Sequence, residues 1–413
     1  MQTHIDTRLL QTDAGKAADD ILRSCVHCGF CTATCPTYQL LGDELDSPRG
    51  RIYLIKQALE GQQITRRSQL HLDRCLSCRS CETTCPSGVQ YASLLEIGRH
   101  LVDQQVQRSV RERLLRWGMK SILPYPSRLA PLVALASTMK PLLPRKWRQK
   151  IPQQRAYDHL PVASQPRKVI LFAGCVQSVV ARQINQAAAR VLERLGIQCI
   201  WVESEQCCGA VNHHLGDRKT AVDFARRNID LWNRHLEDGA EAIIGTASAC
   251  ILEIREYAQQ LQKDPDYATK AQTVSEATLD IGEYIQQQDT SGLQLVDQLP
   301  RVAFHAPCTL QHGLQLKGRT EQLLRSLGFS ITEPRDAHLC CGSAGTYSIL
   351  QPRLATRLRS NKLEALTGEQ ADLIATANIG CLLHLQEGTA TPVRHWIEVV
   401  AESLTEINPS INE

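Results

Sequence analysis

Two cysteine motifs of identical spacing, placed 50 residues apart (75 − 25), constrain this chain more than any other feature. Each copy reads Cys-x-x-Cys-x-x-Cys-x-x-x-Cys-Pro. The cysteines are Cys25, Cys28, Cys31 and Cys35 in the first copy and Cys75, Cys78, Cys81 and Cys85 in the second. A [4Fe–4S] cube needs four thiolates, of which three can come from such a closely spaced run. The motifs therefore predict two [4Fe–4S] clusters near the N-terminus.

The cysteine before each proline is expected to bind the cluster of the opposite motif, as in two-cluster ferredoxins. We therefore predict two ligand sets, each holding one cluster. The first cysteine set is Cys25, Cys28, Cys31 and Cys85, and the second cysteine set is Cys75, Cys78, Cys81 and Cys35. Pro36 and Pro86 would turn the chain away after the last ligand. His27 is expected to be a loop residue, because its cluster is already complete. A pair of zinc sites is the alternative, but zinc ligands usually come as two separated pairs.

Cysteine usage also bears on the compartment, since 17 of the 413 residues are cysteines. Residues 1–6 lack the basic region and apolar core of a secretory signal. We therefore expect a cytosolic protein, in which clustered cysteines are metal ligands or redox groups rather than disulfides. No stretch reaches the roughly 18 apolar residues of a membrane-spanning helix, so we expect a chain that can lie against a membrane without crossing it. The net charge of +3 is small, and no basic run suggests a nucleic-acid partner.

A helix is predicted between the two motifs. Ser47 is a suitable N-cap, and Pro48 suits the first helical position. Ile52, Ile55 and Leu59 then fall on one helical face. This pattern indicates a helical domain that separates two cysteine-rich loops.

A second and longer repeat fills the rest of the chain. Each copy has a cysteine, a Cys-Cys-Gly triplet and a later cysteine. These are Cys175, Cys207, Cys208 and Cys250 in the first CCG copy and Cys308, Cys340, Cys341 and Cys381 in the second CCG copy. The offset is 133 for the first three pairs (308 − 175) and 131 for the last (381 − 250). Short apolar strands, such as 168–172 and 241–244, alternate with helical stretches, such as 178–195, which predicts α/β units with mostly parallel sheets.

Each CCG copy offers four thiols, and Gly209 and Gly342 would permit the sharp turn that brings adjacent cysteines to one centre. These residues form a candidate third site in one or both copies. An additional iron–sulfur cluster, a zinc ion, a free catalytic thiol and buried apolar cysteines all remain open.

The segment 106–166 has no cysteine and is apolar, basic and rich in proline. Among its residues are Pro124, Pro126, Pro131, Pro141, Pro144 and Pro152. We therefore expect few long regular helices there. The segment is either a connector that packs on its own domains or a surface for a partner subunit or a membrane, to which Trp117 and Trp147 with neighbouring basic residues would be suited.

Together these patterns predict an α+β multi-domain protein. The predicted units are a helical two-cluster ferredoxin-like domain (1–105), a connector (106–166), and two repeated α/β CCG domains (167–297 and 298–413).

The CCG domains resemble those of the cysteine-rich subunit of heterodisulfide reductase. In that family the pattern ends in Cys-x-x-Cys, whereas here Glu253 and His384 take the place of the last cysteine. A heterodisulfide-reductase-like enzyme with its own CCG active site is an alternative function, and the missing last cysteine in both copies counts against it.

The whole architecture, including Ser47-Pro48-Arg49-Gly50-Arg51 between the motifs, resembles the glycolate oxidase iron–sulfur subunit family. The iron–sulfur subunit of anaerobic glycerol-3-phosphate dehydrogenase shares this plan and is a second alternative. The resemblance implies an electron-transfer subunit of a flavin-dependent 2-hydroxy-acid dehydrogenase, which oxidises glycolate to glyoxylate and, as a further candidate, D-lactate. It implies FAD on a partner flavoprotein, since this chain has no G-x-G-x-x-G motif. It also implies a membrane quinone as acceptor and a peripheral position on the cytoplasmic face of the inner membrane.

Overall fold

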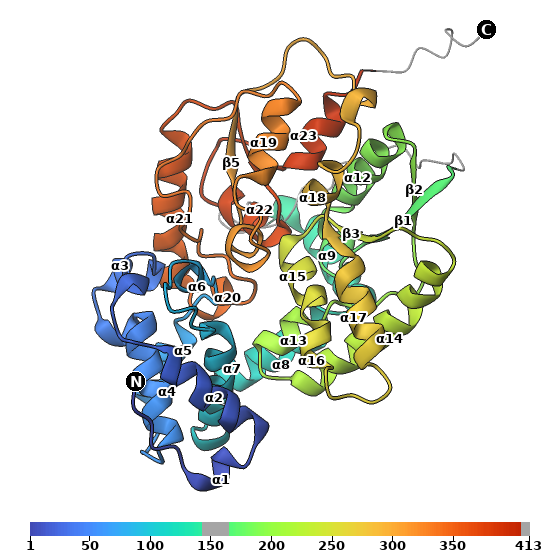
Figure 1. Ribbon diagram of the computed structural model, residues 1–413. Helices are drawn as coiled ribbons and strands as arrows, with labels where there is room; N and C mark the ends of the chain where they lie inside the picture. Colours follow the sequence, from blue (N-terminus) through green and yellow to red (C-terminus); the bar gives the residue numbers. More distant parts are fainter. Residues whose placement is uncertain (143–164, 406–413) are drawn as a thin grey trace, which may run out of the picture.

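The computed structural model describes residues 1–142 and 165–405. Residues 1–105 form a helical domain at the lower left of Figure 1, and the two CCG copies lie beside and above it. The helices of this domain are α1 (Thr7–Leu10), α2 (Asp13–Ser24), η1 (Phe30–Thr32), α3 (Pro36–Leu41), η2 (Glu44–Asp46), α4 (Pro48–Leu59), α5 (Arg66–Asp73), α6 (Ser80–Thr83) and α7 (Tyr91–Gln105).

Helix α4 begins where the sequence predicts. The Ser47 side chain accepts a hydrogen bond of 3.0 Å from the Gly50 amide, and Pro48 is the first helical residue. Ile52, Ile55 and Leu59 are buried against α2 and α7. The predicted helix is confirmed, although α5 also lies between the two motifs.

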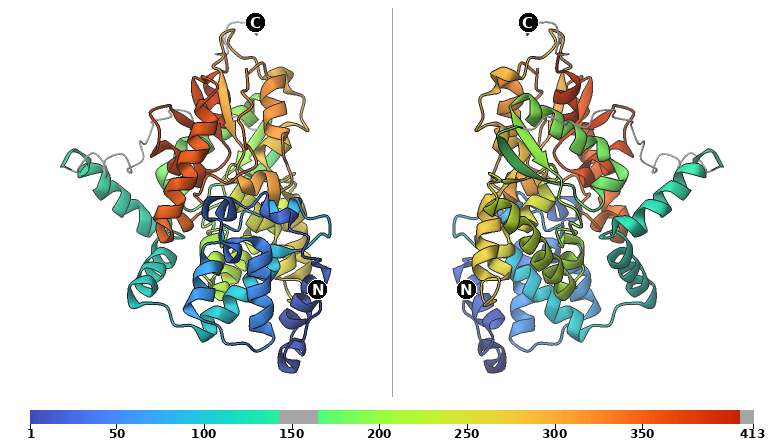
Figure 2. Two further views of the ribbon diagram at one scale, coloured as in Figure 1. Left: turned by 90° about the vertical axis from the view of Figure 1, so that its left-hand side faces the viewer. Right: turned by 90° about the vertical axis from the view of Figure 1, so that its right-hand side faces the viewer.

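The expectation of few long helices in the proline-rich segment is wrong. It contains two helices of 13 residues, α8 (Val110–Ile122) and α9 (Pro126–Thr138), followed by η3 (Lys140–Leu142). Pro126 occupies the first turn of α9, where no amide hydrogen bond is lost. Figure 2 shows the two helices (teal) standing out from the side of the molecule. Residues 143–164, which include Pro144, Trp147 and Pro152, lie outside the described residues.

The first CCG copy contains a four-stranded parallel sheet in the order β2-β1-β3-β4. Ile170 of β1 pairs with both Ile200 of β2 and Ile243 of β3. The elements are β1 (Arg167–Phe172), α11 (Gln177–Val180), α12 (Arg182–Arg194), β2 (Ile197–Ile200), α13 (Ala210–His214), α14 (Arg218–Glu237), β3 (Ile243–Gly245), α15 (Ser248–Arg255), α16 (Tyr257–Gln260), α17 (Ala268–Ala277), β4 (Thr278–Asp280), α18 (Ile281–Ile285) and η4 (Thr290–Gly292).

The second CCG copy repeats this plan with the parallel order β5-β6-β7. Ile331 pairs in parallel with Val302, at the edge that β2 occupies in the first copy. The elements are β5 (Val302–His305), the π-helix η5 (Thr309–Gly313), α19 (Arg319–Ser326), α20 (Tyr347–Leu350), α21 (Pro352–Thr367), β6 (Leu373–Thr376), α22 (Ile379–Gln386), β7 (Val393–His395) and α23 (Trp396–Glu402). The fold class is therefore the predicted α+β arrangement.

The two CCG copies share one hydrophobic core because each sends a helix onto the other. Helix α23 packs on α12, and α18 packs on α19. His395, at the end of β7, is buried and bonds through Nε2 to the carbonyl oxygen of Thr246 at 2.8 Å. The Ser248 amide donates to the Ala377 carbonyl oxygen at 3.2 Å. The carboxyl ends of the strands, where parallel sheets place their ligands, thus meet at the junction of the two copies.

Candidate iron–sulfur and metal centres

The two ferredoxin-type loops share a backbone conformation. His27 (φ 56°) and Gly29 (φ 87°) are left-handed in the first loop, and Ser77 (φ 53°) and Arg79 (φ 58°) are left-handed at the matching positions of the second. Such residues curl the chain so that successive amide groups point into the concave side, which suits an anionic centre. His27 lies in the loop and is exposed rather than enclosed among the cysteines.

The first cysteine set lines one small pocket. Cys25, Cys28, Cys31 and Cys85 all line it, together with Cys81 of the second set. Burial raises the pKa of the Cys25 thiol, and the neighbouring Cys85 and Cys28 raise it further. Burial likewise raises the pKa of Cys31 to about 11. The structure thus brings Cys85 of the second motif to three cysteines of the first.

The second cysteine set is more deeply enclosed. Burial raises the pKa of Cys81 well above its usual range, and Cys78, Cys75 and Cys35 add to the effect. The hydroxyl of Tyr91 donates to Cys75 Sγ at 3.6 Å, which would stabilise a thiolate there.

These residues fit two iron–sulfur clusters. All eight cysteines are free, and they gather in the two predicted groups. Neighbouring buried thiols repel one another when ionised, so only a positive centre such as iron can hold several thiolates at one place. The buried guanidinium of Arg51 adds a fixed positive charge beside Cys75 and Cys35.

Each Cys-Cys-Gly turn has the same geometry in both CCG copies. Gly209 (φ 96°) donates its amide to Cys207 Sγ at 3.4 Å, and Gly342 (φ 88°) donates to Cys340 Sγ at 3.4 Å. A left-handed glycine is what lets the amide turn back toward the sulfur.

The four cysteines of each CCG copy come together. The Sγ atoms of Cys175 and Cys207 are 3.2 Å apart, and Cys208 contacts both Cys207 and Cys250. In the second copy, the Sγ atoms of Cys308 and Cys340 are 3.9 Å apart, and Cys341 contacts both Cys340 and Cys381. The predicted third-site residues thus form one group in each copy.

The residues that replace the family's last cysteine have other partners. Glu253 Oε1 lies 2.8 Å from His213 Nδ1, and His213 Nε2 lies 3.0 Å from Glu96 Oε1 of α7. Burial lowers the pKa of His213, but the two carboxylates outweigh it and raise that pKa to about 10. In the second copy, His384 Nε2 bonds to the Ala355 carbonyl oxygen at 3.2 Å.

A central cavity of about 2100 Å³ opens between the helical domain and the two CCG copies. The cavity is lined by one cysteine of the second cysteine set and by the cysteines of both CCG copies, namely Cys75, Cys175, Cys207, Cys208, Cys250, Cys308, Cys340, Cys341 and Cys381. The helical domain is attached across it by an Arg79–Glu256 ion pair of 2.5 Å and by a hydrogen bond of 2.9 Å between Thr83 Oγ1 and His312 Nδ1.

The second CCG copy is the one that contacts the second cysteine set. Leu76 and Cys78 pack with Cys308 and Cys340 in one buried group. Burial is the main cause that raises the pKa of Cys78, and among the neighbouring groups Cys308 raises that pKa most.

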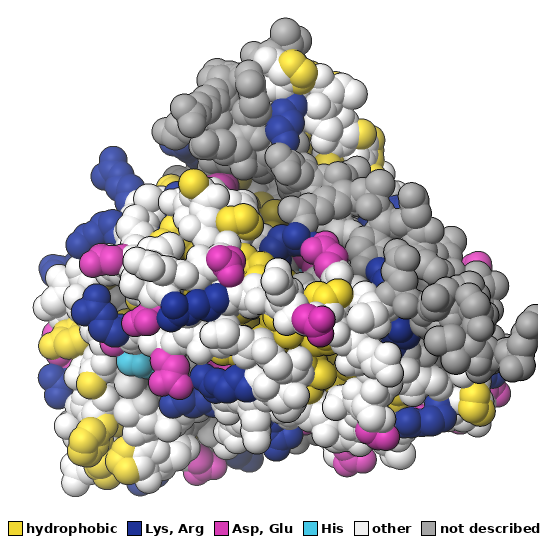
Figure 3. Space-filling model, turned by 90° about the horizontal axis from the view of Figure 1, so that it is seen from above, with side chains coloured by type: hydrophobic (Ala, Val, Ile, Leu, Met, Phe, Trp, Pro, Cys, Tyr) yellow, Lys and Arg dark blue, Asp and Glu magenta, His cyan; other side chains and the backbone are white. Residues whose placement is uncertain are grey.

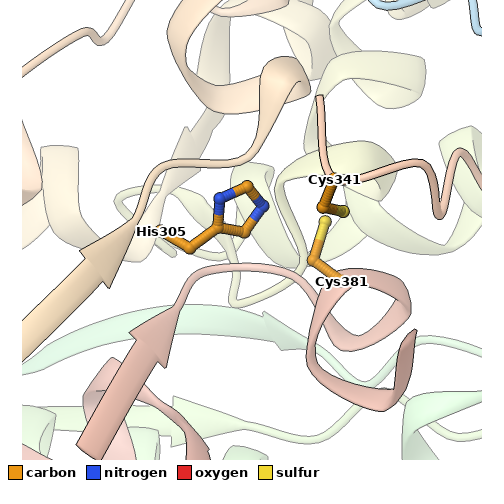
Figure 4. A group of neighbouring side chains, drawn as sticks. All are labelled: His305, Cys341 and Cys381. Atoms are coloured by element: carbon orange, nitrogen blue, oxygen red, sulfur yellow. The ribbon is translucent and has the colours of Figure 1, made fainter. Parts of the chain in front are cut away.

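His305 was missed from the sequence. Its imidazole lies beside Cys341 and Cys381, and the ligand atoms of the three residues are all within 4.8 Å of one another (Figure 4). The repeat offset offers a signal, because 305 − 133 falls on Phe172, an apolar strand residue in the first copy. A histidine in a buried strand beside a repeated cysteine pair is a candidate ligand.

Comparison with known proteins agrees with this architecture. The 4Fe-4S dicluster domain model matches residues 21–89, and the cysteine-rich CCG domain model matches residues 169–255 and 302–386. The glycolate oxidase iron-sulfur subunit of Escherichia coli (strain K12) is 48% identical, over 98% of this chain and 99% of that protein. The probable glycolate oxidase iron-sulfur subunit of Bacillus subtilis (strain 168) is 29% identical, over 94% of each chain.

Two further matches are more distant. Lactate utilization protein A of Exiguobacterium sp. is 24% identical over 57% of this chain and 98% of that protein. A crystal structure of a hypothetical protein from Helicobacter pylori superposes with a TM-score of 0.58, covering 98% of this chain and 74% of that one. At 10% identity, that likeness concerns the fold alone.

A two-cluster ferredoxin-type domain joined to paired CCG domains defines an iron–sulfur electron-transfer subunit of an oxidoreductase. The 4Fe-4S dicluster match and the collected cysteines support the clusters themselves. The chain belongs to the family of glycolate oxidase iron–sulfur subunits.

Proposed function

We propose that this chain accepts electrons from an FAD-containing partner flavoprotein that oxidises glycolate to glyoxylate, with D-lactate as a further substrate. The chain would deliver these electrons toward a membrane quinone. The observation that carries the proposal is the 48% identity, over nearly the whole chain, with the E. coli glycolate oxidase iron-sulfur subunit. The likeness to lactate utilization protein A supports the second substrate.

The iron–sulfur clusters, when bound, supply one-electron transfer, which lets a two-electron oxidation leave the flavin in single steps. The chain's own residues would hold and insulate them. We assign Cys25, Cys28, Cys31 and Cys85 to one cluster and Cys75, Cys78, Cys81 and Cys35 to the other. We also assign Cys175, Cys207, Cys208 and Cys250 of the first CCG copy to a third iron–sulfur centre, because successive contacts join these four thiols into one group.

The test is purification of the tagged full chain from its native host without oxygen. We expect a flavin-containing polypeptide to co-purify, and glycolate to reduce the iron–sulfur clusters, as followed by EPR. Parallel samples receive D-lactate or glycerol-3-phosphate. D-lactate tests the second proposed substrate, and glycerol-3-phosphate tests the alternative dehydrogenase. Reduction by glycerol-3-phosphate alone, or turnover of a disulfide by the isolated chain, would overturn the proposal.

We also propose that the chain is peripheral on the cytoplasmic face of the inner membrane and docks there through α8 and α9. No helix within 1–142 and 165–405 is long and apolar enough to cross a bilayer. Helices α8 and α9 nevertheless expose apolar side chains, as does the residue after α9; these are Val110, Leu114, Leu115, Trp117, Leu132, Leu135 and Met139. Exposed Arg111 and Arg113 lie among them, a combination that suits an anionic lipid surface.

The docking surface can be tested with vesicles. The holoprotein should co-sediment with vesicles containing phosphatidylglycerol, and the Leu114→Glu/Trp117→Glu double variant should lose most of this binding. Val296→Glu alters an exposed apolar residue outside α8 and α9, 43% exposed, and should bind as the parent does. On the face seen in Figure 3, the described Lys and Arg side chains are interspersed with Asp and Glu, and we propose no nucleic-acid partner.

A further inference from the structure

The group formed by His305, Cys341 and Cys381 is buried and comes from three separate elements. His305 ends β5, Cys341 lies in the Cys-Cys-Gly turn, and Cys381 lies in α22. Their exposed fractions are 2%, 1% and 4%. Figure 4 shows the imidazole and the two sulfur atoms directed toward one another.

The imidazole of His305 lacks a partner. Neither Nδ1 nor Nε2 makes a hydrogen bond within the described part of the chain. A buried polar group without a partner destabilises the folded state, so native structures rarely keep one without a reason. Thiols are weak hydrogen-bonding groups, and the two that face the ring do not offset the lost hydrogen bonds of the imidazole. A cation bound between the nitrogen and the two sulfurs would.

Only the second CCG copy has this arrangement. Cys341 and Cys381 correspond to Cys208 and Cys250 of the first copy, but Phe172 stands where His305 does. The matching ring in the first copy cannot bind a metal, and it packs edge-on against Trp232 with the ring centroids 5.6 Å apart. The first copy is a built-in control for what the histidine adds.

The surroundings suit a cationic centre held by thiolates. Lys362 is 4% exposed; burial lowers the pKa of its ammonium group, whereas ionised Cys341 and Cys340 nearby act to raise that pKa. Its ammonium group donates to the carbonyl oxygen of Asp336 at 2.8 Å. The Asn378 side-chain amide donates to Cys381 Sγ at 3.5 Å, the kind of second contact that orients a metal-binding thiolate.

We propose that His305, Cys341 and Cys381 bind one zinc ion, independently of the electron-transfer role. One imidazole and two thiolates form a ligand set of the kind that zinc accepts. All three residues line the central cavity, so a water molecule or another small ligand can take the fourth position. Zinc has no redox chemistry. Its role here would be to fix the Cys-Cys-Gly turn and the strand ends of the copy that contacts the second cysteine set.

The test is metal analysis of the anaerobically purified full chain. We expect about one zinc ion per chain in addition to iron. His305→Phe introduces the residue that the first copy has, and it should reduce zinc at least tenfold while iron and acid-labile sulfide stay unchanged. Cys381→Ser should also lose zinc, whereas its counterpart Cys250→Ser should keep it.

A second measurement uses the parent chain, so it does not depend on whether a variant folds. Zinc K-edge X-ray absorption of the parent chain should give a shell with nitrogen and two sulfur atoms, and Co²⁺ substitution should give sulfur-to-cobalt charge-transfer absorption. A chain without zinc, a zinc shell of sulfur alone, or full zinc retention in His305→Phe would overturn the proposal. Iron held by His305 would overturn it as well.

Discussion

The guanidinium of Arg51 and the carboxylate of Asp46 form a buried ion pair, with Nη2 3.3 Å from Oδ1 and side-chain exposures of 1% and 0%. Asp46 also accepts from Arg74 Nη1 at 2.8 Å. The Asp46 carbonyl oxygen lies 3.7 Å from Cys35 Sγ, and Arg51 donates to Thr37 Oγ1 at 3.1 Å. The pair therefore links the helix between the motifs to the turn that carries a ligand of the second cysteine set.

Removing Arg51 should be costly. We expect Arg51→Met to lower the free energy of unfolding by about 3–5 kcal/mol, because it leaves a buried carboxylate with less compensation. It should also shift the reduction potential of the cluster on Cys35 and Cys75 to a more negative value, since a nearby positive charge favours the reduced state. Urea unfolding and EPR-monitored potentiometry would measure the two effects.

Arg23→Met is the matched control for Arg51. Arg23 also pairs with an aspartate, Asp19, at 2.7 Å, but its side chain is 59% exposed. Exposed pairs contribute little, so we expect a change within about 0.5 kcal/mol and no shift in potential. Equal effects of the two substitutions would contradict the role assigned to the buried pair.

The crossing of ligands between the motifs gives a second prediction. In Cys85→Ser the cluster of the first cysteine set should be lost, although the Cys25, Cys28 and Cys31 loop is unaltered. Iron should fall by roughly four atoms per chain, and the EPR signal of the second set should persist. Loss of the cluster at Cys75, Cys78 and Cys81 instead would show that each motif ligates its own cluster.

Features set by a short stretch of sequence could be predicted, whereas features set by contacts between distant segments could not. The cysteine spacings and the Ser47-Pro48 helix start are local patterns, and both led to correct elements. The number of prolines did not predict α8 and α9, because a proline in the first turn of a helix does not disrupt it. Pro126 falls at the start of α9, and Pro131 is tolerated within it.

The remaining features depend on contacts between distant segments. The Arg74–Asp46 pair and the His213 bridge to Glu96 and Glu253 join segments that no periodicity connects. The position of His305 beside Cys381 requires the parallel order of β5 and β6. The repeat offset could have drawn attention to His305, but not to the two sulfurs that it faces.

The His213 bridge predicts a pH dependence of stability. The pKa of His213 is raised to about 10 by Glu253 and Glu96 despite burial. A raised histidine pKa stabilises the folded state fully below the ordinary value of about 6.5, and that contribution is lost as the pH rises toward 10. Stability should therefore fall by up to about 1.4 kcal/mol per pH unit above neutrality.

Unfolding curves of the holoprotein between pH 6 and 10 would measure this slope. His213→Gln should be less stable near pH 6 and should lose most of the slope, whereas exposed His4→Gln should behave as the parent. An unchanged slope in His213→Gln would assign the pH dependence to other groups.

The glycines of the Cys-Cys-Gly turns predict a graded series of alanine variants. Gly61 (φ 82°) has open space where a Cβ would lie, so Gly61→Ala should cost only the left-handed conformation, about 1–2 kcal/mol. A Cβ on Gly209 would lie 3.1 Å from the Ala221 carbonyl oxygen, and one on Gly342 would lie 2.8 Å from that of Ala355. These backbone atoms cannot move aside without disturbing the helices that hold them, so the loss of unfolding free energy should increase in the order Gly61, Gly209, Gly342. Gly342→Ala should also disturb the amide that donates to Cys340, and with it the metal content of the second CCG copy. Equal losses of unfolding free energy in all three variants would show that the turns are not confined by their surroundings.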